Sequence, residues 1–205
     1  MGAGFLAAWL LAMGLVLYVT GWKRQVAGEA SVRLLWSMAV LLALLHPWPV
    51  RMSDHIVMSG SALGATMIAI VVIFTARPLQ EHISVLLSAA LAAGLSWWSH
   101  YLYRLDPVMV VVAPEWDAPI LIGFIASLLT ERFRYHAAIS VLAVMAAEIG
   151  LAGQAAGEVA IGTLRWWDQT VCAVCMTRLL WNIKYGLQLS WMKMTSIRTR
   201  ARGGN

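Results

Sequence analysis

The stretch GAGFLAAWLLAMGLVLYVTGW, residues Gly2–Trp22, contains no charged residue. At a rise of about 1.5 Å per residue, a helix of this length crosses a hydrocarbon core about 30 Å thick. The run has no basic segment before it and no small-residue cleavage site after it, so we expect a permanent helix and not an export signal. Three further runs without charge have a comparable length, namely Leu34–Val50, Ile56–Ala76 and Ile83–Tyr103.

The composition of the whole chain is that of a membrane protein. Of the 205 residues, 60% are hydrophobic and 12% are charged, whereas about a quarter of the residues in a soluble domain are charged. Shorter uncharged runs follow at 118–130, 136–147 and 170–177, and each needs flanking polar residues to reach spanning length. We therefore expect an all-α integral membrane bundle of seven, or else six, transmembrane helices. Residues 1–192 form one domain, and residues 193–205 form a basic cytoplasmic tail that we expect to be disordered.

Basic residues predict the orientation of this bundle. With seven alternating helices, one set of loops and ends contains eleven Lys and Arg residues and the other set contains three. Because basic residues stay on the cytoplasmic side, we expect the N-terminus outside and the C-terminus in the cytoplasm. The eleven are Lys23, Arg24, Arg33, Arg77, Arg132, Arg134, Lys184, Lys193, Arg198, Arg200 and Arg202, and the three are Arg51, Arg104 and Arg165.

The basic tail and the net charge of +5 invite a nucleic-acid hypothesis. A basic tail that follows a last transmembrane helix usually maintains topology and contacts anionic lipid headgroups. We therefore expect the lipid bilayer as a partner, with anionic lipid at the tail, and no nucleic acid. A second membrane protein, or further copies of this chain, would be compatible with the same sequence.

Small residues at four-residue spacing predict where the helices pack, because helices in lipid associate through close backbone approach. The pattern is common in membrane helices and favours packing of the bundle over any particular activity. It occurs at Gly60 and Gly64, at Ser88, Ala92 and Ser96, and at Ala143, Ala147 and Gly150.

Glu148 is a carboxylate within a predicted transmembrane helix. A charge at membrane depth needs a partner, a proton or contact with water. Arg178 also interrupts an apolar stretch, in the last helix, and is the expected partner. The pair could be an ion or proton site, or a structural ion pair, and a Glu148 close to the surface could instead reach water.

The last helix carries a polar stripe whose four members share one sector of the helical surface. Such a stripe should face protein or water, so we expect this helix to lie at the centre of the bundle. Together with Glu148 and Arg178, the stripe predicts an internal polar cluster. Its members are Asp168, Cys172, Cys175 and Asn182.

Cys172 and Cys175 form a CxxC pair and are the two cysteines of the chain. This spacing allows two thiols to react with each other and predicts, as an alternative function, a membrane-embedded thiol oxidoreductase. Such enzymes normally use a second cysteine pair to pass the electrons on. Two cysteines that pack as small hydrophobic side chains are therefore the favoured interpretation.

Histidines and carboxylates gather on the expected outer side of the membrane. His55, His100, Asp106 and Asp117 could bind a divalent cation or move protons if the fold brings them together. Sorting of basic residues to the inside, which leaves acidic residues outside, is the alternative explanation. The chain has no HExxH spacing, phosphate-binding loop or dinucleotide motif. We therefore predict no metal and no cofactor.

The segment HYLYRLDPVMVV, residues 100–111, followed by Glu148 and Asp168, resembles the YphA family of small multi-pass membrane proteins from endospore-forming Firmicutes. The similarity is strongest in the Leu-Asp-Pro-Val part of the segment and otherwise consists of length and helix layout. It implies a bacterial plasma-membrane location and supplies no catalytic residues. The resulting expectation is a non-enzymatic multi-pass protein, either a partner subunit or a small transporter-like bundle, with the thiol oxidoreductase as the alternative.

Overall fold

A computed structural model describes residues 2–202 except 29, 76–78, 107, 109 and 155–156, and it describes no side chains at 79, 114–115 and 194–202. Arg77 and Pro107 therefore lie outside the described residues, as do the basic side chains at 198, 200 and 202. The chain is mostly helical, which confirms the expected membrane-type helical architecture. Its helices are α1 (Phe5–Leu17), α2 (Lys23–Ala27), α3 (Val32–Leu45), α4 (Gly60–Phe74), α5 (Leu79–Leu105), α6 (Pro114–Leu129), α7 (Phe133–Ala152) and α8 (Leu164–Arg202).

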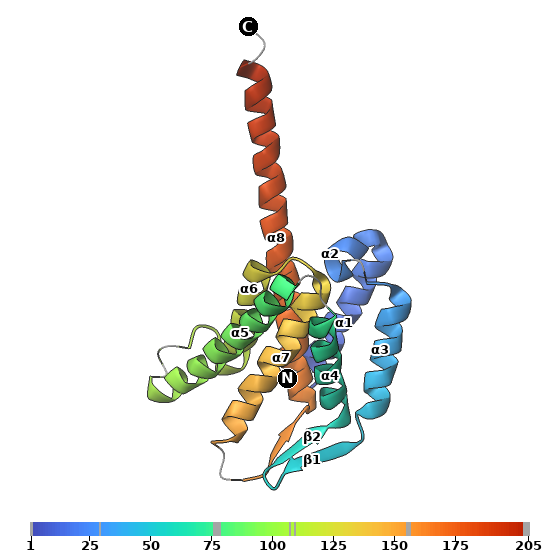
Figure 1. Cartoon of the computed structure of the whole chain (residues 1–205), viewed down its shortest axis with the longest axis vertical. Helices are drawn as coiled ribbons and strands as arrows, with labels where there is room; N and C mark the ends of the chain where they lie inside the picture. Colours follow the sequence, from blue (N-terminus) through green and yellow to red (C-terminus); the bar gives the residue numbers. More distant parts are fainter. Residues whose placement is uncertain are drawn as a thin grey trace.

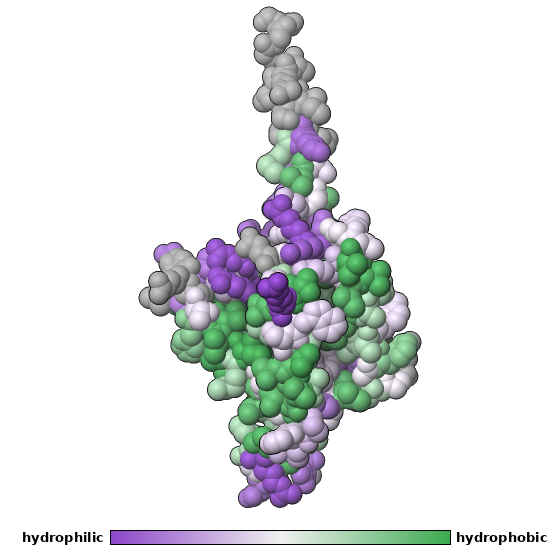
Figure 2. Space-filling view, turned by 90° about the vertical axis from the view of Figure 1, so that its right-hand side faces the viewer, coloured by the Kyte–Doolittle hydropathy of each residue, from purple (hydrophilic) through white to green (hydrophobic). Residues whose placement is uncertain are grey.

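Three helical segments of the described chain are long and apolar enough to cross a membrane: Phe5–Ala27, Gln80–Leu105 and Phe133–Ala152. The first includes a π-helical segment, Tyr18–Trp22, which joins α1 to α2 through a kink at Gly21, where φ is 102°. The apolar helices α3, α4 and α6 are shorter. Figure 2 shows hydrophobic residues covering the middle of the molecule, between polar groups at its two ends.

A small β-sheet closes one end of the bundle, which we call the strand end (Figure 1). Strand β1 (Pro49–Ser53) pairs antiparallel with β2 (Ile56–Ser59), and β2 pairs parallel with β3 (Val159–Ile161). The chain is therefore mostly helical, and the all-α prediction omits this sheet. The β-branched residues Ile56, Val57, Val159 and Ile161 favour strands, and α4 begins at Gly60.

Helices α7 and α8 lie at the centre of the bundle. Helix α7 packs against α4, α5, α6 and α8, and α8 also packs against α1 and α2. The N-terminal part of α8 lies within the bundle, as expected of the last helix, whereas its C-terminal part projects beyond the other helices (Figure 1). The end of the bundle opposite the sheet, which we call the basic end, brings together α2, the start of α7 and the middle of α8.

The small residues mark helix contacts as expected. Ala92 and Ala143 are fully buried, Ser88 and Ser96 are nearly so, and Ala147 is 5% exposed. One glycine that the spacing did not single out makes the closest approach between α6 and α8. A Cβ atom at Gly123 would lie 2.7 Å from Met176 Cβ and 3.0 Å from the carbonyl oxygen of Ala173.

Helix α8 continues to Arg202, ten residues beyond the expected boundary of the membrane domain at residue 192. The backbone at 193–202 is therefore helical, which differs from the disordered tail expected from its charge. A helix that is already nucleated gains one hydrogen bond per added residue, so a polar extension can remain helical without packing contacts.

Candidate functional site

A cavity of about 470 Å³ lies at the strand end, between α5, α7, β3 and the start of α8. Parallel packing of α5 and α7, which are separated in the chain by α6, places the C-terminal turns of both helices here, and β3 leads directly into α8. The lining residues are mostly polar. They are His100, Tyr103, Arg104, Glu148, Leu151, Ala160, Ile161, Thr163, Arg165, Trp166 and Gln169.

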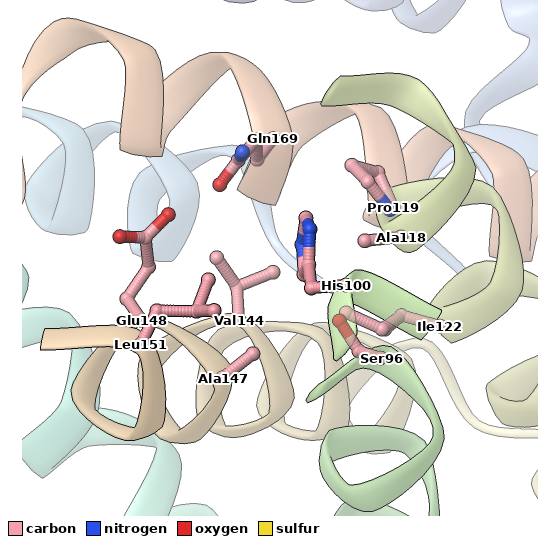
Figure 3. Close-up of a pocket in the computed structure, with 10 residues that line it drawn as sticks. All are labelled: Ser96, His100, Ala118, Pro119, Ile122, Val144, Ala147, Glu148, Leu151 and Gln169. Atoms are coloured by element: carbon pink, nitrogen blue, oxygen red, sulfur yellow. The ribbon is translucent and has the colours of Figure 1, made fainter. Parts of the chain in front are cut away.

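A narrow chamber of about 10 Å³ extends from this cavity into the bundle and shares His100, Glu148 and Gln169 with it. Figure 3 shows the side chains of Glu148 and Gln169 pointing toward one another from α7 and α8. The hydroxyl of Ser96, from α5, lies in the wall of the same chamber. A chamber of this size holds about one water molecule.

Two buried polar atoms at this site have no hydrogen-bond partner within the described part of the chain. Ser96 Oγ belongs to a side chain that is 1% exposed, and Trp166 Nε1 to one that is 2% exposed. Leaving a buried donor unpaired costs about 1–3 kcal/mol, so such atoms normally bond to water or to a ligand. Since Ser96 lines the narrow chamber, its hydroxyl is in position to bond to a water molecule there.

The charged groups of the cavity come from three elements. Arg104 ends α5 and Arg165 begins α8, whereas the carboxylate of Glu148 comes from α7. The Arg104 Nη1 atom donates a hydrogen bond to Gln154 Oε1 over 2.8 Å. With two guanidinium groups and one carboxylate, the cavity carries a net positive charge when His100 is neutral.

The expected partnership of Glu148 with Arg178 is wrong. Arg178 lies at the basic end, where its Nε and Nη2 atoms donate to the carbonyl oxygen of Gln25 over 3.0 and 2.7 Å. Its guanidinium group also lies 4.6 Å from the centroid of the Trp181 ring. Glu148 is at the strand end, because α7 runs antiparallel to α8. Residues on two such helices meet only when they lie at the same depth, and spacing in sequence could not show this.

The polar stripe of α8 holds the N-terminal helices. Both oxygens of Asp168 accept hydrogen bonds of 2.7 Å, one from the Gly4 N–H and one from the Ala7 N–H. About four turns further along, Asn182 Nδ2 donates to the Gln25 carbonyl over 3.1 Å. The predicted cluster of Glu148, Asp168, Arg178 and Asn182 is therefore divided among the cavity and two helix anchors.

Cys172 and Cys175 are free thiols, each half-buried on α8. They lie between the two anchors, within the turns that follow Asp168. A carboxylate one turn away disfavours the thiolate form that redox chemistry requires.

The proposed outer-face set is dispersed as well. His100 reaches the cavity, but Asp117 caps the start of α6 by accepting hydrogen bonds of 2.9 Å from the N–H groups of Val111 and Val112. Asp106 accepts locally from the N–H of Val108, and His55 lies in the turn between β1 and β2. Among the described residues, no group of three or more His, Cys, Asp or Glu side chains is arranged to hold a metal ion.

A second polar site, at the basic end, was not anticipated from the sequence. His136 and Ser140 are both fully buried on α7, and His136 Nδ1 and Ser140 Oγ have no partner among the described residues. His136 Nε2 lies 2.9 Å from the carbonyl oxygen of Thr130. The sequence signal was a histidine at the start of an uncharged run with a serine four residues later, which is one turn along the same helical face.

Comparison with known proteins gives one match. A sequence model of the YphA-like integral membrane protein family matches residues 3–203. No curated protein and no solved structure matches the chain.

Proposed function

The chain belongs to the YphA-like family of integral membrane proteins, and from this premise we propose that it is a small transporter-like bundle that binds a polar solute at the strand end. The observation that carries the proposal is the cavity of about 470 Å³, whose lining combines Arg104, Arg165 and Glu148. Binding pockets for small molecules usually have volumes of about 300–1,000 Å³ and a few convergent polar groups. The cavity has both properties.

The charges of the cavity favour a solute with an acidic group, such as a carboxylate or a phosphate. The guanidinium groups of Arg104 and Arg165 supply positive charge that pairs well with such a group, and Arg104 also donates one hydrogen bond to Gln154. Glu148, on α7, can accept hydrogen bonds from hydroxyl or amino groups elsewhere on the solute.

We further propose seven spans in a bacterial plasma membrane, with the strand end outside. The alternating directions of α1 and α3–α8 support this topology. Lys23, Arg24, Arg132 and Arg134 belong to the basic end, which the positive-inside rule places in the cytoplasm. Helices α3, α4 and α6 have 14, 15 and 16 residues. At about 21–24 Å they are shorter than the hydrocarbon core, so the bilayer must thin locally or the flanking loops must enter it.

This topology predicts which positions are accessible from outside an intact cell. Single cysteines at Ser53 and Glu158, in a Cys172→Ala, Cys175→Ala background, should react with a membrane-impermeant maleimide. A cysteine at Lys193 should react only after the membrane is permeabilised. Labelling of the Lys193 position in intact cells would reverse the topology and place the cavity inside.

Acidic solutes should stabilise the purified protein. In nanodiscs, phosphate, acetate, glycine and glutamate serve as acidic probes, and glycerol serves as a neutral probe. At a free concentration ten times its Kd, a probe that binds should raise the Tm by about 3–6 °C, because only the folded state binds it. Arg104→Gln and Arg165→Gln should each reduce this shift by at least half.

Arg51→Gln is the matched control, because Arg51 lies on β1, outside the cavity. It should retain the full shift. If none of the acidic probes raises the Tm more than glycerol does, or if the Arg51 variant loses the shift as fully as the cavity variants, the proposed acidic solute is excluded.

The alternative of a thiol oxidoreductase gains no support from the structure, in which Cys172 and Cys175 are free thiols. For the cytoplasmic tail, we propose contact with anionic lipid headgroups and no role in nucleic-acid binding. Association with further copies or with another membrane protein is compatible with the exposed apolar faces of the helices.

A further inference from the structure

We propose that α7 carries a proton path from the cavity at the strand end to His136 at the basic end. This inference goes beyond solute binding, because it assigns a role to buried polar groups that do not line the cavity. Two unpartnered atoms on α7, His136 Nδ1 and Ser140 Oγ, support it, together with the narrow chamber next to Glu148 on the same helix.

The hydrogen bond of His136 determines the state of its ring. The Thr130 carbonyl oxygen can only accept, so the Nε2 atom 2.9 Å away must carry a hydrogen. The neutral ring then has a bare lone pair at Nδ1. No described group donates to this nitrogen, although the side chain is fully buried. His136 Nδ1 is therefore a proton acceptor inside the bundle.

A row of residues at four-residue spacing connects this nitrogen with the cavity. Along α7 the row consists of His136, Ser140, Val144 and Glu148, with about 6 Å of helix between successive members. Ser140 Oγ is buried without a partner, and both Val144 and Glu148 line the narrow chamber. On α5, the unpartnered Ser96 Oγ lines the chamber from the opposite side.

The spacing of this row suits bridging waters. Two hydrogen bonds of about 2.8 Å through one water span at most about 5.6 Å, so one water can bridge Ser140 and His136. The two turns from Ser140 to Glu148, about 12 Å of helix with Val144 between them, need a chain of two or three waters. One water fits the chamber beside Glu148 and Ser96, and further waters would satisfy Ser140 and His136. Carboxylates and histidines that occur along a transmembrane bundle in this way are typical of proton relays.

The transfer can be written with protons balanced. A proton from water in the cavity protonates the Glu148 carboxylate and passes through water to the Ser140 hydroxyl, which accepts one proton and releases its own. His136 Nδ1 takes that proton and forms an imidazolium. The ring then releases its Nε2 proton to water at the connection between α6 and α7, where Glu131 is exposed. The ring is then the Nδ1–H tautomer. It returns to the starting tautomer when it reorients toward the same water, loses the Nδ1 proton to it and gains one proton from it at Nε2. This second exchange moves no net proton, so one proton has crossed in total.

The charges around His136 favour onward transfer. From α8, the cationic side chains of Arg178 and Lys184 lie near the ring. From α5, Glu81 and His82 lie at the same end, and the Glu81 carboxylate accepts a 2.6 Å hydrogen bond from the Tyr135 hydroxyl. At the C-cap of α6, the Thr130 carbonyl oxygen faces the ring, and α4 contains no charged residue.

The test is proton flux in liposomes that contain the full-length protein and an entrapped pH-sensitive dye. A potassium diffusion potential, negative inside, should acidify the lumen faster than in liposomes without protein. Ser140→Ala and His136→Gln should each slow the flux about tenfold. Each variant removes about one hydrogen bond from the path, and a loss of this size raises the barrier to proton transfer enough for a tenfold slower rate. Ser88→Ala is the matched control, since this buried hydroxyl already donates to the Ser84 carbonyl, and it should retain wild-type flux.

Two results would overturn the proposal: flux through the wild-type protein that equals that of empty liposomes, or equal flux in the Ser140→Ala and Ser88→Ala proteins. The Ser140 variant removes a single hydroxyl, so it keeps the test valid if His136→Gln fails to fold. The Tm shift with acidic probes separates this inference from the proposed function. Ser140→Ala should keep that shift while it loses proton flux.

Discussion

Replacement of Asp168 by alanine is expected to detach the start of α1 from α8 and to lower the free energy of unfolding by about 2–4 kcal/mol. Helix α1 begins after Gly4, which has no side chain to cap the first N–H groups. The Asp168 carboxylate supplies this cap from another helix, through its two hydrogen bonds of 2.7 Å to Gly4 and Ala7. Its negative charge also complements the positive end of the helix dipole.

Little else holds this end of α1. Ala7 is the one buried residue of α1 within the described chain, and in the apolar 18-residue window of the segment Phe5–Ala27 only 6% of the residues are buried. Lipid provides no hydrophobic force that would press two helices together. Loss of the carboxylate would therefore leave α1 attached mainly through the hydrogen bonds of Arg178 and Asn182 at the basic end.

Amide hydrogen exchange measures this effect directly. In Asp168→Ala, exchange should accelerate at residues 4–8 and remain unchanged in α7, and the Tm should fall. Asp168→Asn keeps one acceptor oxygen and should lose about half as much stability. Asp106→Ala is the control, because that exposed carboxylate caps only the local N–H of Val108. Unchanged exchange at residues 4–8 in Asp168→Ala would show that this carboxylate does not hold α1.

Gly162→Ala is expected to have an equally large effect, with a loss of about 2–5 kcal/mol. Gly162 joins β3 to α8 with φ at 83°, a conformation that L-residues adopt at a cost. An added Cβ would also collide with Ser59 Oγ and lie 2.5 Å from Ala62 Cβ. The substitution should push β3 away from α4. Ile161 and Thr163, which form part of the cavity wall, should move together with β3.

Thermal unfolding in detergent and solute binding together test this prediction. The Gly162→Ala protein should show a lower Tm and a smaller Tm shift with acidic probes. Gly157→Ala is the matched control, because a Cβ at Gly157 meets nothing within 4 Å and its φ is not positive. Equal Tm values for the two variants would mean that the contact with Ser59 and Ala62 can relax without cost.

Residues Gly2–Trp22 and the other uncharged runs were sufficient to predict a helical membrane protein, because burying each backbone N–H and C=O group in lipid requires a continuous helix. The positions of buried small residues, such as Ala92 and Ala143, were predictable for a similar reason. Close helix contacts select small side chains at a local and regular spacing. Both properties depend on residues near one another in the sequence.

Partnerships between helices were not predictable in this way. The sequence by itself determined that Glu148, Asp168 and Arg178 are polar groups in apolar helices and need partners. Only the tertiary structure decided that Asp168 caps α1, that Arg178 holds the carbonyl of Gln25, and that Glu148 lines a cavity. The physical reason is that a hydrogen bond forms only between groups within about 3 Å of each other. The depth and rotation of each helix set that distance, and both result from the packing of the whole bundle.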